Sequence, residues 1–272
     1  MTASAVSVPR PASRSLAPLP GLRALVRKDV GEWTHGPRAI VVLAVTGLFM
    51  TLAAANAWIN AWVIANVPEA AVGGGGKEIV LDPLTNILGA VASQIFVFAA
   101  IFAAMSLIVR ERESGTLAWI ASKPVSRTSI VVSKWLSASV VLWVVAGLVP
   151  LSLTAIVATI LYGAPPIGAV VLAGLGMGGA IALFVAVTLA ASTFVASQPA
   201  VAAVAFAAVF LPSIVNALVP LDIAPFEPTS ILAWAIGGAG GASVGFATPV
   251  AWLIGLVGLG VIAGRRMERL EL

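Results

Sequence analysis

The chain has 272 residues and a formal net charge of +4, yet only 10% of its residues are charged while 60% are hydrophobic. Because a soluble domain needs more charged side chains at its surface, this composition excludes a soluble protein and predicts an integral membrane protein. The lack of cysteine excludes disulfides and thiolate metal sites, and we attribute the basic residues to membrane orientation rather than to nucleic-acid binding.

The N-terminal part of the chain predicts a leader followed by a surface helix. Residues 1–21 are rich in Pro, Ser and Ala and lack a long apolar run, which indicates a disordered cytoplasmic leader; residues 22–272 form a single transmembrane domain. From Leu22 to Trp33, apolar residues recur at helical spacing opposite charged ones, and Gly36-Pro37 follows. This pattern predicts an amphipathic helix in the membrane interface; the alternative is a solvated helix packed on a partner.

Six apolar segments are predicted to cross the membrane. The strongest evidence is residues 135–221, where 87 consecutive residues include no Asp, Glu, Lys or Arg. At about 20 residues per crossing, this stretch holds three spans and their connections. The expected fold is therefore an all-α membrane protein with six transmembrane helices, at residues 39–63, 83–109, 130–161, 167–195, 199–219 and 249–264.

The basic residues predict how these spans are oriented. All 15 except Lys77 lie before the first span, around the connection between the second and third spans, or after the last span. The positive-inside rule places these three segments, and with them both termini, in the cytoplasm. An even number of crossings must then follow residue 134. The Gly-rich residues 230–246 are therefore predicted to form an external re-entrant or interfacial segment, and residues 64–82 and 220–246 to lie outside.

The sequence offers no pattern for catalysis or for binding a metal or cofactor. The run from Gly73 to Lys77 lacks the spacing of a phosphate-binding loop, and His35 is the only histidine, so neither a metal site nor a catalytic triad is expected. We also expect no Asp, Glu, Lys or Arg inside any span. That absence argues against an ion-coupled carrier and against an intramembrane protease.

Polar and small residues inside the spans are interpreted mainly as packing residues. The polar ones are expected to form hydrogen bonds between helices, and the glycines of the fourth and last spans (Gly174, Gly176, Gly178, Gly179, Gly260 and Gly264) to let helices approach closely. Six polar residues are also candidates for lining a substrate pathway: Asn56, Asn60, Asn86, Gln94, Thr188 and Asn216.

The connection between the second and third spans carries the most informative pattern, from Arg110 to Lys134. Gly115 permits a sharp exit from the second span, and Thr116 or Ser114 is predicted to cap a short helix. Ser126 is predicted to cap the third span. The short helix is expected to lie below the membrane, where it suits contact with a cytoplasmic partner. Its apolar face would consist of Leu117, Ile120 and Ala121.

This connection resembles that of the ABC type-2 export permeases, whose signature here is E-x-G-T-L, a short helix, P-[VI]-S-R and a lysine in the next span. The matching residues are Glu113, Gly115, Thr116, Leu117, Pro124, Val125, Ser126, Arg127 and Lys134. The helix at 22–33 is similar to the family's N-terminal elbow helix. The chain departs from the family after Gly115-Thr116, where Leu-Ala-Trp-Ile replaces the frequent Leu-Glu-Leu-Leu.

The resemblance implies a subunit of an ATP-driven exporter in the cell membrane, similar to permeases of drug export and of nitrous-oxide-reductase maturation. Two such chains, as a homodimer or a heterodimer, would form the pathway, and two separate ATPase subunits would bind ATP and Mg below them. The chain itself would hold no cofactor and would not be an enzyme. The residues implied to couple the ATPase to the spans are Glu113, Gly115, Thr116, Leu117, Trp119, Ile120, Pro124 and Arg127.

A non-transporting membrane scaffold or assembly subunit is the alternative function, and a secondary carrier is less favoured. A scaffold explains the spans and the lack of charges within them, but it does not explain the pattern between Glu113 and Lys134. An ATPase with Walker motifs in the adjacent reading frame would favour the exporter.

Overall fold

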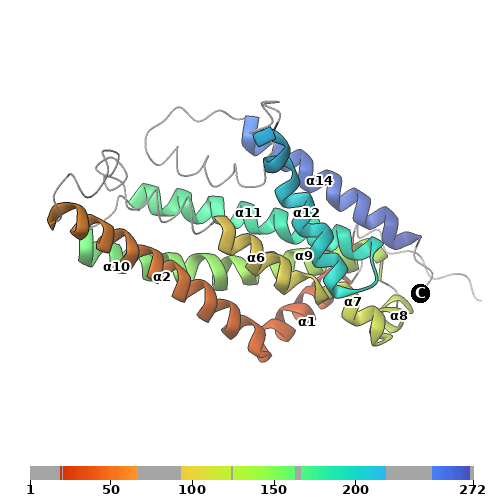
Figure 1. The fold of residues 1–272 in the computed structure, drawn as a ribbon. Coiled ribbons are helices and arrows are strands. Elements are labelled where there is room, and N and C mark those ends of the chain that lie inside the picture. The colour runs from red at the N-terminus through yellow and green to blue at the C-terminus, as the bar shows by residue number, and fades with distance from the viewer. Residues whose placement is uncertain are drawn as a thin grey trace, which may run out of the picture.

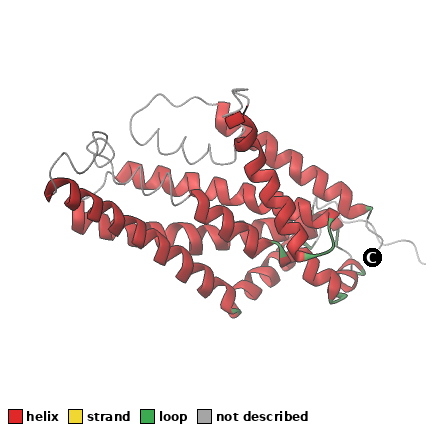
Figure 2. Ribbon diagram, in the orientation of Figure 1, coloured by secondary structure: helices red, strands yellow, loops and turns green. Residues whose placement is uncertain are grey.

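The computed structural model describes residues 19, 21–66, 93–123, 125–162, 167–218 and 247–269. Within these ranges the chain is helical apart from short connections, and no strand occurs (Figure 2). The predicted all-helical class is therefore confirmed for the described part of the chain. The predictions for residues 1–18, 67–92 and 219–246, including most of the leader, the 73–77 run and the Gly-rich segment, lie outside the described residues.

The described helices follow the order shown in Figure 1. They are α1 (Leu22–His35), α2 (Pro37–Asn66), α6 (Ser93–Ala104), α7 (Ser106–Glu113), α8 (Thr116–Ala121), α9 (Arg127–Leu142), the π-helix η2 (Trp143–Leu148), α10 (Val149–Tyr162), α11 (Ile167–Phe194), α12 (Gln198–Leu218) and α14 (Ala247–Glu268).

Three helical segments among the described residues are long and apolar enough to cross a membrane: Arg127–Val157, Val170–Phe194 and Val250–Glu268. A fourth arises if Leu22–His35 and Pro37–Leu52, which are bent by 65° at their junction, form one broken span. The apolar helix Gln198–Pro212 is shorter, and the second predicted span is described only from Ser93 onwards. The multi-pass character is therefore established, whereas the number six stays a prediction.

The third predicted span contains a π-helical turn that the sequence pattern did not indicate. Helices α9, η2 and α10 form one run from Arg127 to Tyr162, and η2 ends two residues before Pro150. Proline lacks a backbone N–H, and in a regular α-helix its ring clashes with the carbonyl four residues earlier, here that of Ala146. The wider π turn relieves this clash, so the helix continues past Pro150 without ending.

Helix α11 lies at the centre of the bundle and packs against α6, α9, α12 and α14. Its side chains Met177, Ile181 and Phe184 are fully buried. Two indole groups of the third span also donate to carbonyl oxygens of α11: Trp135 to Ala182 at 2.9 Å and Trp143 to Gly174 at 2.8 Å. The two pairs are eight residues apart along both segments and run in opposite directions, as in an antiparallel pair of helices. They therefore fix the position of α9 and η2 along α11.

The glycine predictions are confirmed for Gly174 and Gly178 of α11 but not for Gly260 of α14, and those for Gly176 and Gly179 stay predictions. A Cβ atom at Gly178 would lie 2.9 Å from Trp143 Nε1, and one at Gly174 would lie 3.3 Å from the side chain of Leu148. These two glycines therefore permit the close packing of α11 on the third span. At Gly260 a Cβ atom would meet nothing within 4 Å, so the packing role predicted for Gly260 is wrong.

Helices α1, α7 and α8 gather at one end of the bundle, which is also the end where α14 finishes (Figure 1). Helix α1 ends before Gly36-Pro37 as predicted, and it packs on α9 through a buried stripe of Leu25, Asp29 and Trp33. Its location in a membrane interface remains a prediction. The second predicted span was expected to end at Val109, but α7 continues to Glu113 because nothing before Gly115 breaks the helix.

Candidate functional site

The turn between α7 and α8 is formed by Gly115, whose φ angle of 70° lies in the left-handed region that glycine adopts most readily. The prediction that Thr116 or Ser114 caps α8 is wrong. The N-cap is Gly115 and no side chain caps the helix, because the two hydroxyl groups bond to each other at 2.8 Å. Ser126 does cap α9 as predicted, accepting a hydrogen bond from the Ser129 backbone N–H at 3.0 Å.

Helix α8 has one buried face and one exposed face. Leu117 and Ile120 are buried in the hydrophobic core, which confirms the predicted apolar face at these two residues. Trp119 points the other way and is 61% exposed, with the ammonium group of Lys123 lying 3.9 Å from the centre of its ring. The packed face fixes α8 to the bundle, while the exposed face presents an aromatic ring beside a cation.

A network of ion pairs joins α1, α7 and α9 next to this turn. A single carboxylate oxygen of Glu111 on α7 accepts from Lys134 of α9 at 2.9 Å and from Lys28 of α1 at 3.0 Å. Asp29 of α1 lies 3.6 Å from Lys134 and accepts from Ser133 Oγ at 2.9 Å. We call these five residues the ion-pair network; through them α7 is tied to both α1 and α9.

The ion-pair network is buried, so its charges depend on one another. Lys134 is 3% exposed, Asp29 is 5% exposed and Glu111 is 9% exposed. Removing an ion from water is costly, and the two lysines and two carboxylates together carry no net formal charge, which offsets that cost. Glu111 Oε2 is nevertheless buried without a hydrogen-bond partner within the described residues.

Lys28 lies at the outer edge of the ion-pair network. Burial lowers its pKa, but hydrogen bonds to Glu32 and Glu111 together with their negative charges raise it more, so the net pKa is above its usual value. The stabilisation that this shift represents is present below the usual lysine pKa and is lost only as the pH rises through the raised value. Lys28 therefore stays an ammonium group at neutral pH.

Together with Glu32, the ion-pair network resembles a metal site in composition but not in arrangement. Carboxylate oxygens of Asp29, Glu32 and Glu111 lie within 4.8 Å of one another. However, Lys28 contacts all three carboxylates, and Lys134 contacts two of them. Two ammonium groups thus take the place that a cation would need.

Lys134 overturns the expectation that no ionisable residue lies inside a span, although the predicted third span at residues 130–161 already included it. It belongs to the spanning segment Arg127–Val157, seven residues after that segment begins. The sequence reasoning also singled out Glu113, which is exposed and forms no ion pair within the described residues, and it missed Glu111. Local spacing could not have found Glu111, because it follows the apolar Ile108 by three residues while Glu113 follows the apolar Val109 by four, and both spacings place two residues on one helix face.

The remaining residues of the predicted coupling set lie in different places. Gly115, Thr116, Leu117, Trp119 and Ile120 are together in α8 and its N-cap. Arg127 is instead at the start of α9, where Nη1 donates to the carbonyls of Met267 and Glu268 at 3.2 and 2.9 Å. Its positive charge thus complements the C-terminal end of α14. Pro124 lies outside the described residues.

Of the predicted pathway residues, only Thr188 has a described side chain. It is fully buried and donates to the carbonyl of Phe184 in its own helix at 2.7 Å. Thr154, Ser192 and Thr193 also bond within their own helices, so the expected hydrogen bonds between helices are not formed by these residues. The side chains of Asn56, Asn60, Asn86, Gln94 and Asn216 lie outside the description, and their pathway role stays a prediction.

The chain matches the model of a known protein family. The model of a family described as ABC-2 family transporter protein matches residues 23–231, well over half of the chain. The matched range begins within α1, contains the whole ion-pair network and α8, and ends before α14. No curated protein matches the chain significantly.

Proposed function

Because the chain belongs to the ABC-2 family of transporter proteins and is thus a membrane subunit of an ABC transporter, we propose that it is an export permease driven by a separate ATPase through α8. The proposal gives α8 the role of docking on the ATPase. It also gives the ion-pair network the role of transmitting the movement of α8 to the spans.

The observation that carries this proposal is the two-sided environment of α8. Leu117 and Ile120 anchor the helix in the core, so α8 cannot be displaced without moving the elements that it contacts. Trp119 is exposed, and its helix α8 lies at the end of the bundle where the charged elements gather (Figure 1). A large exposed aromatic ring beside a cation is typical of residues that anchor protein interfaces, and Trp is enriched among such anchors.

The path from α8 into the spans follows direct contacts. Helix α8 packs on α7, and α7 carries Glu111, whose carboxylate binds Lys134 in α9 and Lys28 in α1. A shift of α7 would therefore pull on the start of the third span and on α1 together. Buried ion pairs suit this role because their geometry is strict: breaking one leaves an uncompensated buried charge.

The rest of the arrangement is proposed from the family and from the charge pattern. Members of this family generally partner with ATPase subunits. We assign two ATPase subunits, which bind ATP and Mg, and a second permease chain that completes the pathway. We also assign six spans, both termini and residues 110–134 in the cytoplasm, and a location in the cell membrane. The positive-inside rule supports this orientation.

The test is reconstitution with an ATPase that carries Walker motifs, to be sought in the adjacent reading frame. The two proteins are copurified in lipid nanodiscs and ATP hydrolysis is measured per assembled complex. We expect the chain alone to neither bind nor hydrolyse ATP, and Trp119→Ala to weaken copurification and permease-dependent ATP hydrolysis. Trp62→Ala is the matched control, because Trp62 is similarly exposed (56%) but lies in a different helix, near the C-terminal end of α2.

Three outcomes would contradict the proposal. ATP binding by the chain alone would refute the division of labour. Equal effects of Trp119→Ala and Trp62→Ala would remove α8 as the docking element. Copurification without any effect of the chain on ATP hydrolysis would favour a non-transporting scaffold.

A further inference from the structure

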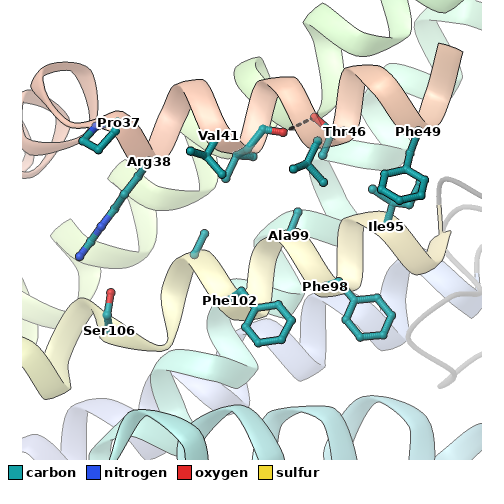
Figure 3. Close-up of a pocket in the computed structure, with 13 residues that line it drawn as sticks. Pro37, Arg38, Val41, Thr46, Phe49, Ile95, Phe98, Ala99, Phe102 and Ser106 are labelled. Carbon is teal, nitrogen blue, oxygen red and sulfur yellow. Dashed lines mark hydrogen bonds between the residues drawn. The ribbon is translucent and has the colours of Figure 1, made fainter. Parts of the chain in front are cut away.

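An apolar groove lies between α2 and α6, as Figure 3 shows, with a volume of about 770 Å³. Val41 and Phe49 from α2 and Phe98 and Phe102 from α6 line it, and each is about half exposed. From Arg38 to Phe49 helix α2 rises about 16 Å, so the groove is elongated along the bundle. Its size is that of a ligand pocket, and its walls suit a hydrocarbon chain.

The free polar groups of this groove are confined to one end. Thr46 is satisfied, because its hydroxyl donates to the carbonyl of Val42 at 2.7 Å. Arg38 and Ser106 point toward one another at the end marked by Pro37 (Figure 3). Neither side chain forms a hydrogen bond or ion pair within the described residues. Arg110, exposed on α7 and four residues after Ser106, adds a second guanidinium group on the same helix face.

Arg38 also marks a boundary in polarity. It is the second residue of α2, and no Asp, Glu, Lys or Arg occurs in the rest of that helix. Its guanidinium group therefore lies where the apolar surface begins, and no carboxylate among the described residues forms an ion pair with it. An anion that is covalently joined to a hydrocarbon chain would satisfy both parts of the groove at once.

We propose that the groove binds one anionic phospholipid, with its phosphate at Arg38 and Ser106 and an acyl chain between α2 and α6. Basic pockets between transmembrane helices favour anionic headgroups, and arginine binds phosphate oxygens in a bidentate manner. The acyl chain of the bound lipid covers the apolar walls of the groove, which would otherwise contact mobile membrane lipid. The inference requires only that the chain is a membrane protein, so it stands apart from coupling to an ATPase.

The test uses the full chain purified in mild detergent and examined by native mass spectrometry. Phosphatidylglycerol and phosphatidylcholine with the same acyl chains are added in equal amounts, and inorganic phosphate is added in a separate sample. We expect phosphatidylglycerol to be retained at least several-fold more than phosphatidylcholine. Equal retention of the two lipids, or retention of phosphate with no lipid preference, would overturn the proposal.

Two variants locate the bound lipid. Arg38→Gln is expected to abolish the preference for phosphatidylglycerol, whereas Arg23→Gln is expected to keep it, because Arg23 is exposed on α1 and does not line the groove. Ala99→Phe adds bulk to the groove wall without changing charge, and it is expected to reduce the retention of phosphatidylglycerol. Unchanged retention in either groove variant would overturn the proposal, as would a lipid-free dimer that forms by covering the groove with a second copy.

Discussion

At the scale of single residues, the buried carboxylate of Glu111 joins α7 to both α1 and α9. One of its oxygens accepts from two lysines of different helices, and the other has no partner within the described residues. Lys134 is placed in the same way, since it is buried in a spanning helix between Asp29 and Glu111. Because these charges compensate one another, the loss of any one of them leaves the others in a low dielectric with less compensating charge.

The first prediction concerns the loss of a single charge. Lys134→Met is expected to destabilise the chain by roughly 3–5 kcal/mol, because the buried carboxylates of Asp29 and Glu111 then share only the more exposed Lys28 as a counter-ion. The measurement is the midpoint of thermal unfolding in detergent, followed by tryptophan fluorescence. Lys123→Met is the control, because Lys123 is exposed in the segment after α8. Adding Glu111→Gln to Lys134→Met should recover part of the loss; an unchanged midpoint in Lys134→Met would show that the ion-pair network does not contribute to stability.

At the scale of elements, two features fix how the helices meet. The π turn η2 places Trp143 over Gly178 of α11, where the indole N–H donates to Gly174. The positive φ of Gly115 sets the direction in which α8 leaves α7. Both features rely on glycine, but for different reasons: Gly178 provides space for a neighbouring ring, and Gly115 provides a backbone conformation.

The second prediction tests the space at Gly178. A Cβ atom there would lie 2.9 Å from Trp143 Nε1, so Gly178→Ala must displace the indole ring. We expect a loss of about 1–3 kcal/mol, the usual effect of overpacking. Gly260→Ala is the matched control within an apolar helix, because a Cβ atom there meets nothing within 4 Å. The measurement is the midpoint of thermal unfolding of the two variants. Equal midpoints would show that the Trp143 ring moves aside without loss of stability.

The third prediction tests the conformation at Gly115. A Cβ atom there would meet nothing within 4 Å, so a substitution acts through the backbone alone. Gly115→Val is expected to reorient α8, because a β-branched residue is strongly disfavoured at φ 70°, whereas Gly115→Asn tolerates this conformation. The quantity to measure is permease-dependent ATP hydrolysis per assembled complex. We expect a loss for valine and near-normal activity for asparagine; equal activity would mean that the direction of α8 does not matter.

At the scale of the whole molecule, charge is distributed unevenly along the bundle. Within the described residues, every Asp, Glu, Lys and Arg lies in α1, at the start of α2, in the first half of α9, in α7 or the segment after α8, or at or just after the end of α14. These elements meet at one end (Figure 1). The described parts of the opposite end carry no ionisable Asp, Glu, Lys or Arg side chain. This polarity agrees with a bundle whose charged end faces the cytoplasm.

The fourth prediction concerns orientation. The chain contains no cysteine, so single cysteines report their location without background. Lys77→Cys is expected to react with an impermeant maleimide in intact cells. Ser122→Cys, in the exposed segment after α8, is expected to react only after permeabilisation. The unaltered chain is the control, and the reverse labelling pattern would invert the orientation.

The sequence alone was sufficient for features that depend on composition and local spacing. A chain with so few charges must be a membrane protein, and long apolar runs between punctuating Gly and Pro must be helices. Ser126 as a cap, the end of the first helix at Gly36-Pro37 and the buried face of α8 all follow from neighbouring residues. These predictions are confirmed because the interactions that determine them lie within a few positions along the chain.

Only the tertiary structure decided which distant residues meet. The choice of Glu111 over Glu113, the burial of Lys134 and the contact of Arg127 with α14 depend on how α1, α7, α9 and α14 pack. Charge pairing is not encoded in sequence spacing, because several carboxylates could have reached the same lysine. The rotation and register of each helix select one of them, and in a low dielectric that selection becomes strict, since a buried charge without its partner costs several kcal/mol.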